Sequence, residues 1–240
     1  MANAFDPSLF NIDIIAISDQ EVKYIREVTN PNIFEPSSNR FDKAGLFSTE
    51  IFGPVGSPAR NTQLGYIDLK VKVLHPFVFQ TLCTLNSKYE DILSGKKRAK
   101  LDRDKWDLVE DSSGETGYEF FMSVLPRIRF NDNGSNERKY KINFIKKYAN
   151  EKFMSDKYLV LPAGLRDYRV DETGRPTEDE INTLYRRLLA VTALLKTIKV
   201  SKDNLYQVDP IRYKIQKSCN AIFDHFLQLL SPKSGFIQNK

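Results

Sequence analysis

The chain has 240 residues, 41% of them hydrophobic and 28% charged, so it can bury a core as one large or two small domains. Its net charge of +5 favours a polyanionic partner, and its two cysteines, Cys83 and Cys219, form no CxxC pair, which excludes a zinc ribbon and a disulfide framework. Without a signal-peptide core or an apolar run of about 18 residues, we expect a soluble protein in a reducing compartment.

In the first two thirds of the chain, the sequence predicts short strands and helices separated by loops. Residues 45–61 contain repeated Gly and Pro, which is typical of a surface loop. Residues 65–79 alternate apolar and polar side chains and predict a strand that ends at His75-Pro76, and residues 77–85 predict a helix. Residues 94–117 alternate in charge sign, which favours a solvated connection.

The C-terminal third carries the strongest pattern. Thr177 and Glu180 form a candidate capping box, and Asp209 with Pro210 supplies an N-cap and a first-turn proline. After each start, apolar residues recur at three- and four-residue steps, the pattern of a coiled-coil seam. The seam residues are Ile181, Leu184, Leu188, Val191, Leu195 and Ile198, then Ile215, Cys219, Ile222, Phe226 and Leu229. The two seams predict an antiparallel hairpin with arms about 30 Å long.

No catalytic constellation stands out in the sequence. His75 and His225 have no sequence neighbours suited to metal binding or acid–base work, so both are interpreted as structural. The acidic residues between Asp102 and Asp111 are interleaved with basic ones, which favours a solvated face over a metal site. Neither a P-loop nor a GxGxxG motif occurs.

Two features point to partners. The loop before the first helical arm presents three arginines whose guanidinium groups suit phosphate contacts, although an ordinary surface loop explains them as well. On the arm itself, Leu189, Ala190 and Ala193 are apolar on the face opposite the seam, where polar residues are expected. This face indicates either a docked partner or packing against the rest of the chain.

Four motifs, in order, resemble the N-terminal part of the β-prime subunit of multisubunit DNA-directed RNA polymerases. GLFSTEIFGPVG at 45–56 is similar to a signature near the start of that family, and GYIDLKVKVLHPFVF at 65–79 to a strand that follows it. LPAGLRD at 161–167, followed by INTLYRRLLAVTALLK at 181–196, is similar to the lid loop and the first helix of the clamp coiled coil. SGFIQNK at 234–240 is similar to the opening of the switch segment.

Departures from the family pattern show which of its members the chain resembles most. SPARNTQL alone separates the first two motifs, where cellular subunits carry a four-cysteine zinc ribbon, and the rudder loop is reduced to Ser231-Pro232-Lys233. Residues 190–195 are apolar where bacterial relatives carry polar, sigma-binding residues. Such changes resemble the divergent split polymerases of giant bacteriophages. The chain would then end inside the switch segment, as a natural split polypeptide or as a fragment.

The resemblance implies an α+β, predominantly helical fold, an RNA polymerase clamp with a long antiparallel coiled-coil hairpin and short strands. It divides the chain into a clamp core at 1–161, a lid-like loop at 162–176, the coiled-coil hairpin at 177–230 and the start of the switch segment at 231–240. The catalytic aspartates of the family lie downstream of these motifs. The chain alone should therefore be inactive and act only as part of a nucleotidyltransferase.

By the same resemblance, the chain would hold template DNA and the RNA–DNA hybrid, join other polymerase subunits and dock a sigma-like promoter-specificity factor, in the cytoplasm of an infected bacterial host. The expected nucleic-acid-binding residues are Arg166, Arg169, Arg175, Lys233, Gln238, Asn239 and Lys240. The expected factor-binding residues are Tyr185, Arg186, Arg187, Leu189, Ala190 and Ala193. No cofactor is expected in this chain, because Mg²⁺ belongs to the complete enzyme and the zinc ribbon is missing.

Two interpretations from other classes stay open. A non-enzymatic coiled-coil adaptor with incidental basic charge explains the hairpin and the missing active site, but not the ordered motifs. A free-standing single-strand-binding protein requires aromatic residues interleaved with basic ones. Tyr158, Tyr168 and Tyr185 are the candidates for that role.

Overall fold

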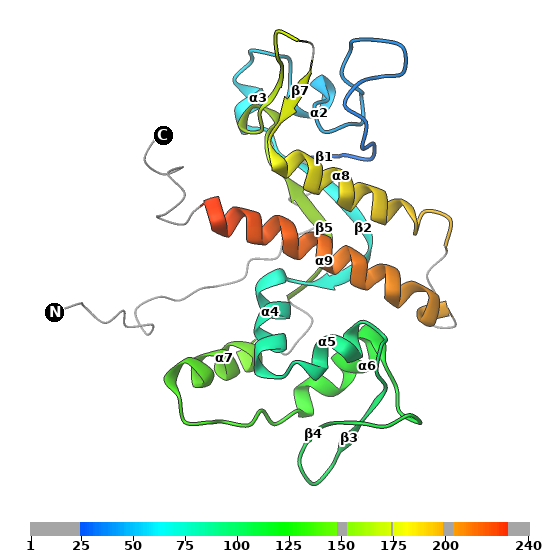
Figure 1. The fold of residues 1–240 in the computed structure, drawn as a ribbon, viewed down its shortest axis with the longest axis vertical. Helices are drawn as coiled ribbons and strands as arrows, with labels where there is room; N and C mark the ends of the chain where they lie inside the picture. Colours follow the sequence, from blue (N-terminus) through cyan, green and yellow to red (C-terminus); the bar gives the residue numbers. More distant parts are fainter. Residues whose placement is uncertain (1–24, 148–152, 174, 199–203, 230–240) are drawn as a thin grey trace, which may run out of the picture.

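A three-stranded sheet lies at the centre of the protein (Figure 1). The computed structural model describes residues 25–147, 153–173, 175–198 and 204–229. The middle strand is β2 (Gly65–Leu74), with β1 (Arg26–Glu27) parallel to it on one side and β5 (Met154–Val160) antiparallel on the other. The strand predicted from the alternation is confirmed, because Ile67, Leu69 and Val71 are buried.

Two helices, α8 (Glu180–Ala193) and α9 (Leu205–Leu229), lie side by side across this sheet (Figure 1). Both helices contact β2, so the strand and the two helices share one apolar core. Leu69 of β2, Leu188 of α8 and Ile215 of α9 are fully buried in it. The apolar residues that recur at helical spacing in α8 and α9 are therefore buried against the sheet as well as against the other helix.

A second core lies at the lower end of Figure 1, between residues 74 and 153. Its helical elements are α4 (Pro76–Leu85), α5 (Lys88–Leu93), α6 (Gly117–Val124), the 3-10 turn η2 (Leu125–Arg127) and α7 (Asn136–Lys147). The helix predicted at 77–85 is confirmed as α4. The predicted solvated connection instead contains an antiparallel hairpin, β3 (Ala99–Asp102) with β4 (Asp107–Glu110).

The upper end of Figure 1 holds the short helices and the remaining hairpin. These elements are α2 (Thr49–Phe52), α3 (Ala59–Thr62), the 3-10 turn η4 (Ala163–Leu165), β6 (Tyr168–Val170) and β7 (Pro176–Glu178). β6 pairs with β7 in antiparallel fashion. The segment predicted as a lid-like loop thus contains a helical turn and one strand of a hairpin.

The predicted long coiled-coil hairpin is wrong. α8 ends at Ala193, short of the last residues of its predicted seam, and both helices pack into the body of the protein. The reason lies on a second, polar face of α9. Gln216 accepts from Leu74 N and donates to Leu74 O, both at 2.8 Å, and Arg212 Nε donates to Lys72 O at 2.6 Å. The fold is mixed α+β with small sheets, not a predominantly helical clamp around a coiled-coil arm.

The predicted helix starts are also wrong. Thr177 lies in β7, and Asp179 precedes α8 without a capping bond from its side chain. α9 begins at Leu205, so Pro210 lies inside the helix and removes one backbone donor from it. Asp209 is buried instead of capping a helix, and its Oδ1 has no hydrogen-bond partner.

Candidate functional site

The segments that carry the sequence motifs meet at the guanidinium group of Arg166. Its Nη2 donates to Leu46 O at 2.6 Å, its Nη1 to Asn182 Oδ1 at 2.6 Å and its Nε to Leu161 O at 3.0 Å. One side chain thus joins the segment before α2, the segment before η4 and the first turn of α8. We call Leu46, Leu161, Arg166, Asn182 and Tyr185 the Arg166 junction.

Aromatic rings surround this buried charge. The guanidinium carbon lies 5.1 Å from the ring centre of Phe47, 5.3 Å from that of Phe52 and 5.7 Å from that of Tyr185. Arg166 is 1% exposed, and burial lowers its pKa to about 10, so it remains protonated at neutral pH. The predicted phosphate contact of Arg166 is therefore wrong for this structure, since its donors point into the protein.

Tyr185 belongs to the same junction. Its hydroxyl oxygen accepts from Leu161 N at 3.3 Å, and burial raises the pKa of the phenol to about 12. Tyr185 is 1% exposed, so it is not available as the factor-binding residue that the sequence predicts. Asn182 completes the junction by donating from Nδ2 to Asp167 O at 3.2 Å, which fixes the backbone just after Arg166.

Gly164 lies where the backbone of η4 approaches the backbone of α3 closely. A Cβ added to Gly164 would lie 2.9 Å from Arg60 O and 1.9 Å from Asn61 Oδ1, so η4 packs against α3 with no room for a side chain. Arg60 in turn donates from Nη1 to Gly53 O at 3.1 Å. The Gly-Pro-Val loop and the LPAGLRD segment are therefore held against each other.

The other two loop arginines lie at the surface, on the β6–β7 hairpin. Arg169 is exposed in β6 and forms an ion pair with Asp167 at 2.8 Å, with 77% of its side chain accessible. Arg175 is exposed next to the turn, where its backbone N–H donates to Asp171 Oδ1 at 2.8 Å. The hairpin thus presents two guanidinium groups to solvent beside the exposed side chain of Val170.

The predicted factor-binding face of α8 is divided by the structure. Leu189 is 4% exposed and belongs to the core, so this residue cannot contact a partner in the way predicted. Arg186 is half-buried and forms an ion pair with Glu178 of β7. Arg187, Ala190 and Ala193 are exposed at three-residue steps and form a short outward stripe on α8.

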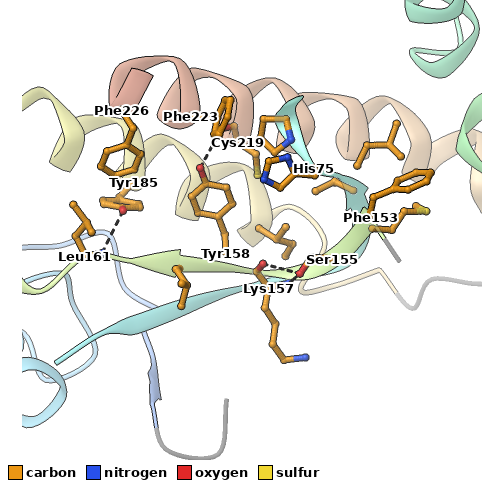
Figure 2. Close-up of a pocket in the computed structure, with 16 residues that line it drawn as sticks. His75, Phe153, Ser155, Lys157, Tyr158, Leu161, Tyr185, Cys219, Phe223 and Phe226 are labelled. Atoms are coloured by element: carbon orange, nitrogen blue, oxygen red, sulfur yellow. Dashed lines mark hydrogen bonds between the residues drawn. The ribbon is translucent and has the colours of Figure 1, made fainter. Parts of the chain in front are cut away.

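An apolar cavity of about 370 Å³ lies between the β2–β5 sheet and the second half of α9 (Figure 2). Its polar groups are already engaged, since the Tyr158 hydroxyl donates to Cys219 O at 3.3 Å and His75 Nδ1 accepts from Phe77 N at 3.2 Å. Burial lowers the pKa of His75 and raises that of Cys219 far above the usual range of a thiol. The cavity therefore suits apolar groups and offers no acid–base pair.

The remaining predicted residues, Lys233, Gln238, Asn239 and Lys240, lie outside the described part of the chain. Within the described part, no group of three or more His, Cys, Asp or Glu side chains is placed to hold a metal ion, and no helix is long and apolar enough to cross a membrane. No protein-family model matches the chain, and no curated protein matches its sequence. The Arg166 junction is thus the feature on which a function can be proposed.

Proposed function

We propose that this chain is the N-terminal clamp part of a β-prime-like subunit of a multisubunit DNA-directed RNA polymerase, of the divergent split kind. The Arg166 junction supports this proposal. Leu46 of the first polymerase-like motif bonds to Arg166 of the third, and Arg166 bonds to Asn182 of the helix motif that follows. These bonds join three of the stretches that carry the resemblance.

The second polymerase-like motif meets the first as well. A Cβ added to Gly65, the first residue of β2, would lie 3.0 Å from Cζ of Phe52. Phe52 of the first motif therefore leaves little room for a side chain at the glycine of the strand motif. In this way three separate stretches resembling the polymerase family form one packed unit.

In the complete polymerase, the β6–β7 hairpin would contact the nucleic acid. Arg169 and Arg175 have exposed guanidinium groups that suit phosphates of the template strand and of the RNA–DNA hybrid. Such contacts position nucleic acid without reading its sequence and weaken as salt rises. Promoter choice would come from a sigma-like factor, for which the outward stripe of Arg187, Ala190 and Ala193 is the proposed contact.

Catalysis would depend on other polypeptides of the same enzyme. These would supply the catalytic aspartates and bind Mg²⁺, and the assembly would work in the cytoplasm of an infected bacterial host. This chain would then contribute structure and nucleic-acid contacts to a nucleotidyltransferase, without activity of its own.

The test is purification of the tagged full chain from its native host cell, followed by mass identification of the co-purifying proteins. We expect large polypeptides with the catalytic aspartate motif and template-dependent RNA synthesis in the purified fraction. If the folded chain is recovered without such polypeptides, the proposal is rejected and the adaptor interpretation is favoured.

A paired variant tests the role of the hairpin within that complex. Arg169→Glu with Arg175→Glu should reduce RNA synthesis without preventing assembly, because both side chains are exposed. Arg103→Glu with Lys105→Glu, at two exposed positions in the β3–β4 turn, makes the same change of charge and is the matched control, which should leave synthesis unchanged. Equal activity of both variants would exclude the hairpin arginines from nucleic-acid contact.

A further inference from the structure

The excess positive charge of the protein is concentrated in one stretch, residues 127–147. This stretch contains seven Arg and Lys residues and two acidic ones, Asp132 and Glu137, so its net charge of +5 equals that of the whole chain. It covers the end of η2, the following loop and all of α7. The rest of the protein is therefore neutral on balance, and a polyanion would be drawn first to this region.

In the β3–β4 hairpin, by contrast, acidic residues nearly balance the basic ones. Residues 96–111 contain six Arg and Lys residues, but also five acidic ones. Lys97 pairs with Glu110 at 2.6 Å, and Lys100 pairs with Asp111 at 3.0 Å. Residues 96–111 thus contain nearly as many basic side chains as residues 127–147, but they carry little net charge.

The outward face of α7 carries lysines at helical spacing. Lys139, Asn143 and Lys146 are exposed and lie at positions i, i+4 and i+7, so the two lysines are about 10 Å apart along the helix axis. Arg138 is different, because its Nη2 donates to Leu85 O at 3.2 Å and its Nε donates to Asn131 O. Arg138 therefore holds α7 in place, whereas Lys139 and Lys146 face solvent.

An aromatic cleft of about 210 Å³ lies between α4 and α7. Its residues from α7 are Tyr140, which follows the outward Lys139 directly in the chain, Phe144 and Lys141, whose ammonium group pairs with Glu137 at 2.6 Å. Its walls include Phe77, Tyr140 and Phe144, and the rings of Phe77 and Phe144 meet edge to face at 5.1 Å. Thr81 and Thr84 line the cleft too, and their hydroxyls donate inward to the backbone of α4, which leaves their oxygens as acceptors. Aromatic walls with hydroxyl acceptors suit a planar base with N–H donors.

We propose that the α4–α7 cleft and the outward lysines of α7 form a binding site for single-stranded nucleic acid. Lys139 and Lys146 contact phosphates, and an unpaired base stacks on Tyr140 at the cleft. A duplex fits less well, because its bases are paired and stacked away from an aromatic wall. The site is separate from the β6–β7 hairpin, at the other end of the molecule (Figure 1), and the inference does not rest on the proposed polymerase function.

The experiment measures fluorescence anisotropy of labelled 20-mers of deoxythymidine and of uridine, and of a 20-base-pair duplex, titrated with the full chain at several salt concentrations. Binding of either single strand more tightly than the duplex is expected, and the two single strands show whether DNA or RNA is preferred. Lys139→Glu with Lys146→Glu should weaken binding and lower the slope of log affinity against log salt by roughly 1.4. Tyr140→Ala should weaken binding by about 5- to 150-fold, and Tyr140→Phe should restore it.

The control is Lys100→Glu with Lys105→Glu, which makes the same charge change on the nearly neutral β3–β4 hairpin and should leave binding unchanged. Equal binding of duplex and single strands, an effect of the control as large as that of the α7 variant, or wild-type affinity of Tyr140→Ala would each overturn the proposal in favour of a general polyanion surface. Because Lys139 and Lys146 are exposed, their variant should fold and decides the matter even if Tyr140→Ala does not fold.

Discussion

Replacing Arg166 with methionine removes a cation that bonds to Leu46, Leu161 and Asn182 at once, while keeping an apolar side chain of similar length. Each hydrogen bond from a charged donor contributes about 1.5–3 kcal/mol, and each buried acceptor left unpaired costs about 1–3 kcal/mol. Relief from burying the guanidinium group offsets part of this loss. We therefore expect the Arg166→Met variant to be about 3–5 kcal/mol less stable than the wild type.

Urea unfolding followed by circular dichroism measures this change. With a slope of about 3 kcal/mol per molar urea, the midpoint should fall by roughly 1–1.7 M. Arg169→Met is the matched control, because Arg169 is exposed and its change should stay within about 0.5 kcal/mol. A midpoint for Arg166→Met within about 0.3 M of the wild type would show that the junction does not stabilise the fold, and would refute the reasoning.

Three further changes test other contacts. Gln216→Leu leaves both backbone groups of Leu74 unpaired, so the free energy of unfolding should fall by about 2–4 kcal/mol in the same urea assay. Burial raises the pKa of the Asp209 carboxyl above its usual value, so the folded state binds this proton more tightly and stability is lost as pH rises through the folded pKa. Asp209→Asn should therefore raise the melting temperature at pH 7, with the gain disappearing below about pH 4. Gly164→Ala brings a methyl group to 2.9 Å from Arg60 O, and calorimetry should show a loss of about 1–3 kcal/mol.

The strands and helices whose buried residues recur at regular intervals could be predicted from the sequence. The strand from Gly65 to Leu74 alternates because one face packs on the helices, and α8 and α9 repeat their apolar residues because each buries one stripe. The coiled-coil arrangement could not be predicted, since a seam has the same spacing whether it meets a helix or a sheet. Buried Gln216 and Asn220 on α9 were the available signal, because polar residues at regular steps on a helix also mark a contact.

The contacts of the Arg166 junction could not be predicted from the sequence for a different reason. Arg166 occurs in a Gly- and Pro-rich segment, which favours an exposed loop, and two of its three acceptors are backbone carbonyls. Carbonyl groups are common to all residues, so no residue type reveals that Leu46 and Leu161 would bind it. Asn182 was the one side-chain partner with a sequence signal, as a polar residue next to the apolar Ile181 in the first turn of α8.

The junction also ties the exposed hairpin to α8. Asp167 N donates to Asp179 Oδ2 at 2.7 Å, and Asp167 O accepts both from Asp179 N at 3.0 Å and from Asn182 Nδ2 at 3.2 Å. The base of β6 is therefore fixed to the first turn of α8, whose outward stripe is the proposed factor contact. Under the proposed function, a factor bound to that stripe would share one rigid support with Arg169, so docking of the factor and placement of the hairpin would be mechanically linked rather than independent.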